Sequence, residues 1–126
     1  MTGSEIKEFF RLYHKIDNLA SEIFDKFDDA DLLASNIYCP KYERIEFDEC
    51  GSNLVIRYYD SGYDIYEYDT IEIPFEIIYE DKVDEYIENK KKEKEEFLKR
   101  LEQRDIERQL EKEKAEYERL KAKFEK

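Results

Sequence analysis

The sequence predicts an α+β fold with an N-terminal amphipathic helix, a three-stranded antiparallel meander and a long C-terminal helix that is partly coiled coil. Three observations predict it. Apolar residues repeat at helical spacing over the first 27 residues, alternating runs separated by short turns fill residues 44–73, and residues 82–126 contain neither Gly nor Pro. We therefore expect an acidic head over residues 1–81 and a long charged helix over residues 82–126, with its distal part protruding.

The first helix is expected to begin near Thr2 or Ser4 and to run for about 24 residues. Thr2 and Glu5 have the spacing of a capping box, in which the two residues exchange hydrogen bonds at the helix start. The apolar residues that follow keep to one helical face, and they are Ile6, Phe9, Phe10, Tyr13, Ile16, Ala20, Ile23, Phe24 and Phe27. Such a stripe is stable only when it is covered, so this helix should pack on the sheet.

Two polar residues of this helix lie in or beside the apolar stripe. Asp17 falls inside it and should accept a hydrogen bond from a tyrosine or from Arg57, although a functional carboxylate is an alternative. His14, the only histidine, falls at the edge of the stripe. We expect it to cover the core from the rim rather than to act as a catalytic base.

Three strands are predicted, over residues 44–49, 54–59 and 63–73. The turns at residues 50–53 and 60–62 are too short for a parallel crossover, so the sheet should be an antiparallel meander. Gly62 in the second turn is expected to supply a positive φ. Pro74 should end the third strand, and the apolar residues after it should lead into the last helix.

The last helix carries two apolar stripes on different sides. With Val83 set to zero and about 100° per residue, the first stripe lies within about 60° and contains Ile87, Lys94, Phe97, Leu98 and Leu101. The second lies at about 100–180° and contains Ile106, Leu110, Tyr117, Leu120 and Phe124. Two stripes predict two partners, which we expect to be the rest of this chain for the first and a second molecule for the second.

The second stripe also fits a heptad pattern, with Glu113 as its one charged member. Leu110, Tyr117 and Phe124 take one core position, and Ile106, Glu113 and Leu120 take the other. This pattern predicts a homodimer or a partner helix. Three alternatives compete with it: a fold-back near residues 103–105, a frayed end, and a stutter in one supercoil.

The charge of the chain is unevenly distributed. Residues 1–81 contain 7 Lys+Arg and 20 Asp+Glu, a net of −13, and residues 82–126 contain 15 and 14, a net of +1; together they give the −12 of the whole chain. The acidic head should be repelled by phosphate backbones, so we expect no direct nucleic-acid binding. It should be attracted to basic protein surfaces. The alternative is that its charge only keeps the protein soluble.

Several functional classes find no support in the residues. The chain has no apolar run long enough to cross a membrane and no signal-peptide pattern, so a cytoplasmic protein with free thiols at Cys39 and Cys50 is expected. One histidine and three glycines leave no basis for a Ser-His-Asp site, a His-based metal site or a phosphate-binding loop. We therefore expect no enzyme, no metal and no cofactor.

Tyrosine is more informative about function than histidine, glycine or cysteine. The chain contains eleven tyrosines and no Trp. Tyrosines gather with carboxylates around the second turn and the third strand. Tyrosine gives large, rigid contact area with a polar tip, and beside carboxylates it suits an arginine-rich partner. The predicted partner-binding residues of the head are Asp60, Tyr63, Asp64, Tyr66, Glu67, Tyr68 and Asp69. The alternative is that these tyrosines lie beneath a helix with only their hydroxyls at the rim.

Two segments in the second half of the chain carry a resemblance. Residues 71–78 read IEIPFEII, and the charged helix ends with EYERLKAKF at residues 116–124. Residues 63–126, which hold both segments, resemble small accessory proteins of bacteriophages and other mobile elements. The resemblance implies no catalytic residues, and it implies a setting that includes inhibitors of host defence such as anti-CRISPR and anti-restriction proteins.

These observations give two hypotheses. The first is a non-catalytic acidic factor of phage type that occupies a basic, nucleic-acid-binding surface of a host protein. The second is a structural or assembly protein that forms oligomers through its C-terminal coiled coil.

Overall fold

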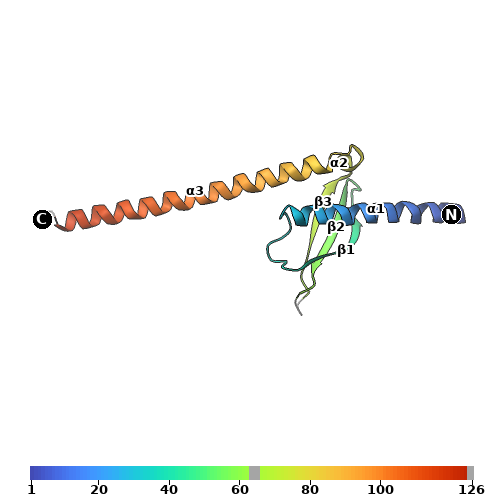
Figure 1. The fold of residues 1–126 in the computed structure, drawn as a ribbon, viewed down its shortest axis with the longest axis horizontal. Helices are drawn as coiled ribbons and strands as arrows, with labels where there is room; N and C mark the ends of the chain where they lie inside the picture. The colour runs from blue at the N-terminus through green and yellow to red at the C-terminus, as the bar shows by residue number, and fades with distance from the viewer. Residues whose placement is uncertain (63–65, 125–126) are drawn as a thin grey trace. The chain divides into compact units, whose positions relative to one another are not determined.

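The structure is a computed structural model and describes residues 1–62 and 66–124. Its elements follow in the order α1 (Gly3–Asp29), β1 (Pro40–Phe47), β2 (Asn53–Asp60), β3 (Tyr68–Pro74), α2 (Phe75–Tyr79) and α3 (Val83–Phe124) (Figure 1). The predicted α+β class is confirmed. The chain divides into two compact units, Met1–Lys91 and Lys92–Lys126. The first unit extends beyond residue 81 because Val83 and Ile87 of α3 belong to its core.

α1 begins with the predicted capping box. The hydroxyl of Thr2 accepts a hydrogen bond from the backbone N–H of Glu5 at 3.1 Å, and the Glu5 carboxylate accepts one from the N–H of Thr2 at 3.3 Å. The two bonds satisfy backbone donors that the first turn of a helix leaves open.

Both α1 and α2 end in a Schellman motif with an aspartate in the left-handed position. After α1, Asp31 has φ 56° and the N–H of Leu32 bonds the carbonyl of Phe27 at 2.9 Å. After α2, Asp81 has φ 56° and the N–H of Lys82 bonds the carbonyl of Ile77 at 2.9 Å. Glycine is the usual residue at this position because it has no Cβ to clash, so each aspartate costs some stability.

The sheet has the order β1-β2-β3, and both strand pairs are antiparallel. A bulge between Tyr42 and Arg44 shifts the register of β1 and leaves Glu43 as the extra residue. β1 begins at Pro40, earlier than predicted, because proline is tolerated as the first residue of a strand. β3 begins at Tyr68, later than predicted, and the described residues 66 and 67 before it are not strand.

The two strand turns differ from expectation in their use of glycine. Gly51, between β1 and β2, has φ 66°, whereas Gly62 does not have a positive φ. Gly62 is needed for a different reason: a Cβ there would lie 2.9 Å from the Sγ atom of Cys39. The glycine therefore allows the close approach of two backbone segments.

The core lies between one face of the sheet and the helices α1 and α3 (Figure 1). α1 contributes its C-terminal half, and α3 contributes only its first turns. The buried members are Ala20, Ile23, Phe24, Phe27, Ile37, Ile45, Leu54, Ile56, Tyr58, Ile71, Ile73, Val83 and Ile87. The cross-strand pairs Ile45–Ile56 and Ile56–Ile71 run through its centre.

The first stripe of α3 was expected to be covered by the rest of the chain, and this is only partly so. Val83 and Ile87 are buried, but Phe97, Leu98 and Leu101 are exposed. α3 is one helix throughout Val83–Phe124, so the alternative of a fold-back at residues 103–105 is wrong. Neither Gly nor Pro is present in this segment to end the helix.

Candidate functional site

The sheet has one face on the core and one face that no described element covers. The alternation along β2 explains this, because Leu54, Ile56 and Tyr58 point to the core while Val55, Arg57 and Tyr59 point away. We call the second side the open face. It consists of Lys41, Glu43, Arg44, Glu46, Val55, Arg57, Tyr59, Tyr66, Tyr68, Thr70 and Glu72, of which Val55 is buried.

Arg57 is the centre of the open face. Its Nε donates to Glu43 Oε2 at 2.8 Å, and the Tyr66 hydroxyl donates to the same oxygen at 2.6 Å. Its guanidinium carbon lies 3.7 Å from the centroid of the Tyr68 ring, a close cation–π contact. One arginine therefore fixes a carboxylate and two tyrosines.

Arg57 also stands directly opposite Arg44 in the register, an arrangement that is unfavourable for two like charges. Two glutamates lie near both guanidinium groups. Glu43 lies 3.8 Å from Arg44, and Glu46 lies 3.1 Å from Arg44 and 3.7 Å from Arg57. The alternating charges turn a repulsive pair into a network.

The hydrogen bonds of this network change the acidity of its members. The pKa of the Glu43 carboxyl lies below its usual value, first because Tyr66 donates to the carboxylate and then because Arg57 does. The pKa of Arg57 is raised, first by its bond with Tyr66. Both groups therefore stay charged at neutral pH, so the network does not switch in the physiological range.

The tyrosines of the open face stack in a row. The Tyr59 and Tyr66 rings lie 6.0 Å apart and nearly parallel, and Tyr66 and Tyr68 are also 6.0 Å apart. Tyr66 and Tyr68 are each 53% exposed. The row presents rigid aromatic surface to the outside, and the rings are held in place before any partner arrives.

The structure separates the residues that the sequence grouped as a partner-binding set. Tyr66 and Tyr68 lie on the open face. Glu67 and Asp69 do not: Glu67 accepts from the side chain of Asn36 at 3.3 Å, and Asp69 pairs with Tyr58, whose side chain is in the core. Tyr63 and Asp64 lie outside the described residues.

Asp60 corrects the prediction, because it is a structural residue rather than a contact for a partner. It is only 4% exposed. Its carboxylate accepts hydrogen bonds from the backbone N–H groups of Gly62 at 2.9 Å, Tyr38 at 3.2 Å and Cys39 at 3.3 Å. These bonds lower the pKa of the carboxyl, with the Gly62 bond first among them. Asp60 therefore ties the segment before β1 to the end of β2.

Arg57, Glu43, Glu46 and Tyr59 are among the residues of this face that the sequence analysis did not select. The two-residue period of side chains along a strand could have placed Arg57 and Tyr59 on one face. Nothing in the sequence marks the bulge that brings Glu43 to the same side.

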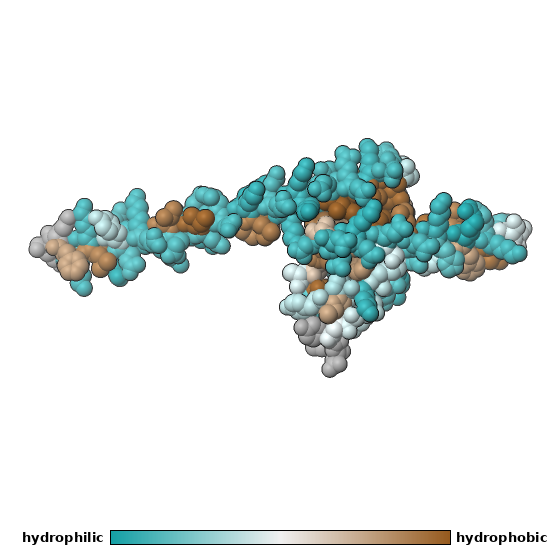
Figure 2. Space-filling view, viewed as in Figure 1, coloured by the Kyte–Doolittle hydropathy of each residue, from teal (hydrophilic) through white to brown (hydrophobic). Residues whose placement is uncertain are grey.

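The distal part of α3 forms a second exposed surface. Its five predicted contact residues are 41–79% exposed, and they are Ile106, Leu110, Tyr117, Leu120 and Phe124. No described residue between 92 and 124 is buried. Figure 2 shows apolar side chains lying open along this part of the helix. We call these five residues the distal stripe.

A third exposed apolar surface lies on the first turns of α1, where Ile6, Phe9 and Phe10 are uncovered (Figure 2). The ring centroids of Phe9 and Phe10 are 5.6 Å apart, and those of Phe9 and Tyr13 are 6.1 Å apart. The stripe predicted for this helix is therefore buried only in its C-terminal half. Its first half extends past the sheet.

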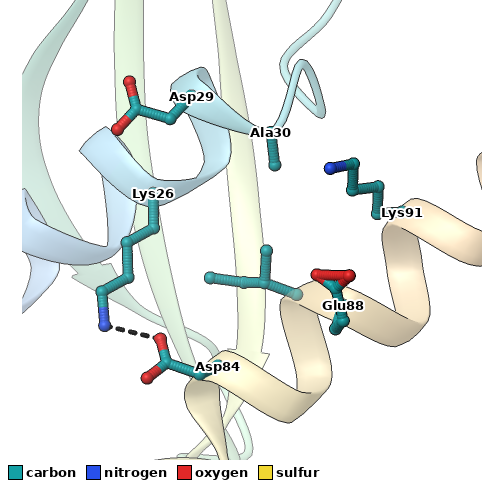
Figure 3. A pocket seen from close by; sticks show the side chains of 7 residues that line it. Lys26, Asp29, Ala30, Asp84, Glu88 and Lys91 are labelled. Atoms are coloured by element: carbon teal, nitrogen blue, oxygen red, sulfur yellow. Dashed lines mark hydrogen bonds and ion pairs between the residues drawn. The ribbon is translucent and has the colours of Figure 1, made fainter.

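A pocket of about 320 Å³ lies where the end of α1 meets the start of α3 (Figure 3). Lys26 of α1 points across it to Asp84 of α3, and the two form an ion pair of 2.7 Å. Its other lining residues are Asp29, Ala30, Ile87, Glu88 and Lys91. Its two lysines face three carboxylates, and every buried side-chain polar atom among the described residues has a partner. The pocket is best understood as a joint between two helices.

The described residues give little support for other kinds of functional site. Asp17 accepts a hydrogen bond from the Tyr42 hydroxyl, as one of its predicted alternatives required. Cys39 and Cys50 are exposed and free. Among residues 1–62 and 66–124, no cluster of His, Cys, Asp or Glu could hold a metal ion. None of the helices described is long and apolar enough to cross a membrane.

Comparison with known proteins gives no relative to reason from: no family model, curated protein or solved structure matches the chain. The functional argument therefore depends on the surfaces alone.

Proposed function

We propose that this protein is a non-catalytic binding factor whose head attaches to a basic surface of another protein through the open face. The observation that carries the proposal is the row of Tyr59, Tyr66 and Tyr68, the last two exposed and held by Arg57, on a sheet face that no described element covers. A sheet face that only contacts solvent would need no ordered row of aromatic side chains. Exposed tyrosines at fixed positions are typical of protein-binding surfaces.

The charge of the head supports a basic partner. The net of −13 over residues 1–81, from 7 basic and 20 acidic residues, attracts a positive surface at long range and repels nucleic acid. On the open face, Glu43 and Glu46 are engaged with arginines, whereas Glu72 is exposed and forms no ion pair with an arginine of the described residues. Partner arginines can stack on Tyr66 and Tyr68 while Glu72 and the net negative charge of the head balance their charge.

The resemblance to phage accessory proteins supports a particular setting for such a factor. A partner whose basic surface normally holds DNA or RNA, such as a host-defence protein, would be blocked when the acidic head occupies it. In that setting, double-stranded DNA and this protein compete for one site.

The test compares capture of proteins by the wild type and by Tyr66→Ala/Tyr68→Ala from a bacterial lysate. We expect a protein that is captured at 50 mM NaCl, released at 500 mM NaCl and by excess DNA, and absent with the variant. The matched control is Tyr38→Ala/Tyr79→Ala, which removes two exposed tyrosines from elsewhere in the head. Equal capture by the open-face variant and by the control would contradict the proposal.

A second candidate function is assembly through the distal stripe. The observation that favours it is the exposure of all five apolar residues at coiled-coil spacing on a helix that continues to Phe124. Large exposed apolar stripes on a stable helix mark sites of association. The two functions are compatible because they use different surfaces.

A further inference from the structure

We infer that the distal stripe pairs with the same stripe of a second copy in antiparallel orientation, with the two-fold axis at the level of Ala115. This inference rests on the second candidate function, assembly through α3, and goes further by fixing orientation and register. The occupant is a second copy of this chain because the stripe is complementary to its own reverse.

The complementarity follows from the spacing of the seam residues. Ile106 and Phe124 lie at equal distances from residue 115, and so do Leu110 and Leu120, and Glu113 and Tyr117. An antiparallel pair centred there places each of these residues opposite its counterpart in the second copy. Antiparallel α-helices with this spacing place one core position opposite the other, layer after layer. The register uses every residue of the stripe.

Glu113 decides the orientation. In a parallel dimer in register, Glu113 would meet Glu113 of the second copy in the seam, and two carboxylates would have to lose water beside each other. In the antiparallel register, Glu113 lies opposite Tyr117 of the second copy, whose hydroxyl can donate a hydrogen bond to the carboxylate. Glu113, the one charged residue at a core position of the heptad seam, then has a hydrogen-bond donor beside it in place of a second carboxylate.

Side-chain size favours the same orientation. A parallel dimer would stack Tyr117 on Tyr117 and Phe124 on Phe124, two aromatic residues in one layer. The antiparallel register places Phe124 opposite Ile106, and Tyr117 opposite the smaller Glu113. Alternation of large and small residues across facing positions fills the seam more evenly.

The charged residues beside the seam do not reverse this choice. The antiparallel register brings Glu107 near Lys121 twice, and it also brings Lys114 and Glu116 near their own copies once each. A parallel dimer would gain Glu116 beside Lys121 twice and suffer Glu102 beside Glu107 twice. Exposed pairs of this kind contribute only a few tenths of a kcal/mol each, so the seam determines the orientation.

The test is the distance between spin labels on the outer side of the helix, where they leave the seam intact. Ala115 and Ala122 are both exposed and lie on the face away from the stripe. Each is changed to Cys separately in a Cys39→Ser/Cys50→Ser background, since both natural thiols are exposed. Double electron–electron resonance then measures the label-to-label distance within the dimer.

The antiparallel register predicts a clearly longer distance for Ala122→Cys than for Ala115→Cys. The two labels at position 122 are displaced along the axis by about 21 Å, since each lies seven residues from the axis level and the rise is about 1.5 Å per residue. Labels at position 115 have no such displacement.

Equal distances for the two variants mean a parallel dimer and overturn the register while leaving assembly in place. Absence of any dimer distance overturns assembly and the register together. A Leu110→Ser change in either labelled chain should remove the signal.

Discussion

The head and the distal part of α3 differ in the burial of their apolar residues. In the head, thirteen of the described residues are buried in one cluster, contributed by α1, Ile37, one sheet face and the first turns of α3. Between residues 92 and 124, no described residue is buried, although Phe97, Leu110 and Phe124 are as apolar as anything in the core. The same kinds of residue are thus covered by this chain in one region and left open in the other. The difference indicates that the head buries its own core, and it supports the proposal that another molecule completes the distal helix.

The largest expected effect comes from comparing two phenylalanines, one in each region. Phe24 is buried against the rings of Tyr42 and Tyr58, whereas Phe97 is exposed. Phe24→Ala should lower the free energy of unfolding by about 3–5 kcal/mol, and Phe97→Ala should change it by less than about 0.5 kcal/mol. Urea denaturation followed by circular dichroism measures both. If Phe24→Ala does not fold, Ile56→Val should cost about 1 kcal/mol. Similar values for Phe24 and Phe97 would contradict the comparison.

The next effect concerns Asp60 and its dependence on pH. Because the folded pKa of this carboxyl is lowered by the N–H groups of Gly62, Tyr38 and Cys39, its stabilisation is fully present above the unfolded pKa of about 4. It is lost as the pH falls below that value through the folded pKa. The stability difference between the wild type and Asp60→Asn should therefore be largest at neutral pH and shrink below about pH 4. Asp69→Asn, which changes an exposed carboxylate, is the control. A difference that does not vary with pH would count against this role of Asp60.

A smaller effect is expected on the open face. Arg57→Lys keeps the charge but loses the planar group that contacts the Tyr68 ring and the Nε that bonds Glu43. We expect a loss of about 0.5–1 kcal/mol in stability and increased mobility of the Tyr66 and Tyr68 rings in NMR spectra. Arg44→Lys, at a more exposed arginine of the same network, should have less effect. Unchanged tyrosine rings in Arg57→Lys would show that the row is ordered by something other than this arginine.

The smallest effect is a gain in stability at the end of α2. Asp81 occupies a left-handed position with φ 56°, where glycine has no steric cost. Asp81→Gly should stabilise the head by about 0.5–1 kcal/mol. The matched change Asp28→Gly, in the last turn of α1, should instead destabilise it by about 0.3 kcal/mol. Thermal unfolding distinguishes the two, and a loss of stability in Asp81→Gly would contradict the assigned motif.

The sequence predicted the features that depend on local periodicity. The capping box at Thr2, the first helix, the antiparallel strands and the long last helix all follow from residue types at regular spacing. The continuity of the last helix was left open by the sequence. The placement of Asp17 beside a tyrosine also followed, because a carboxylate in an apolar stripe requires a donor.

The features it missed depend on register. The late start of β3 and the bulge at Glu43 decide which side chains share a face, and neither has a local signal. For this reason Glu43 was not selected, and Glu67 and Asp69 were grouped with tyrosines from which the sheet separates them. Asp60 was taken for a surface residue because its backbone donors come from a distant segment, Tyr38 and Cys39.

The most direct test of the central claim, that a second copy completes the distal helix, is the mass in solution by light scattering over a range of concentrations. The wild type should rise from 15.5 kDa towards twice that mass, and Leu110→Ser/Leu120→Ser should stay at 15.5 kDa with an unchanged unfolding temperature of the head. Phe97→Ser, outside the distal stripe, should still form the dimer. A wild type that remains at 15.5 kDa at every concentration, or a double variant that still doubles its mass, would contradict the claim.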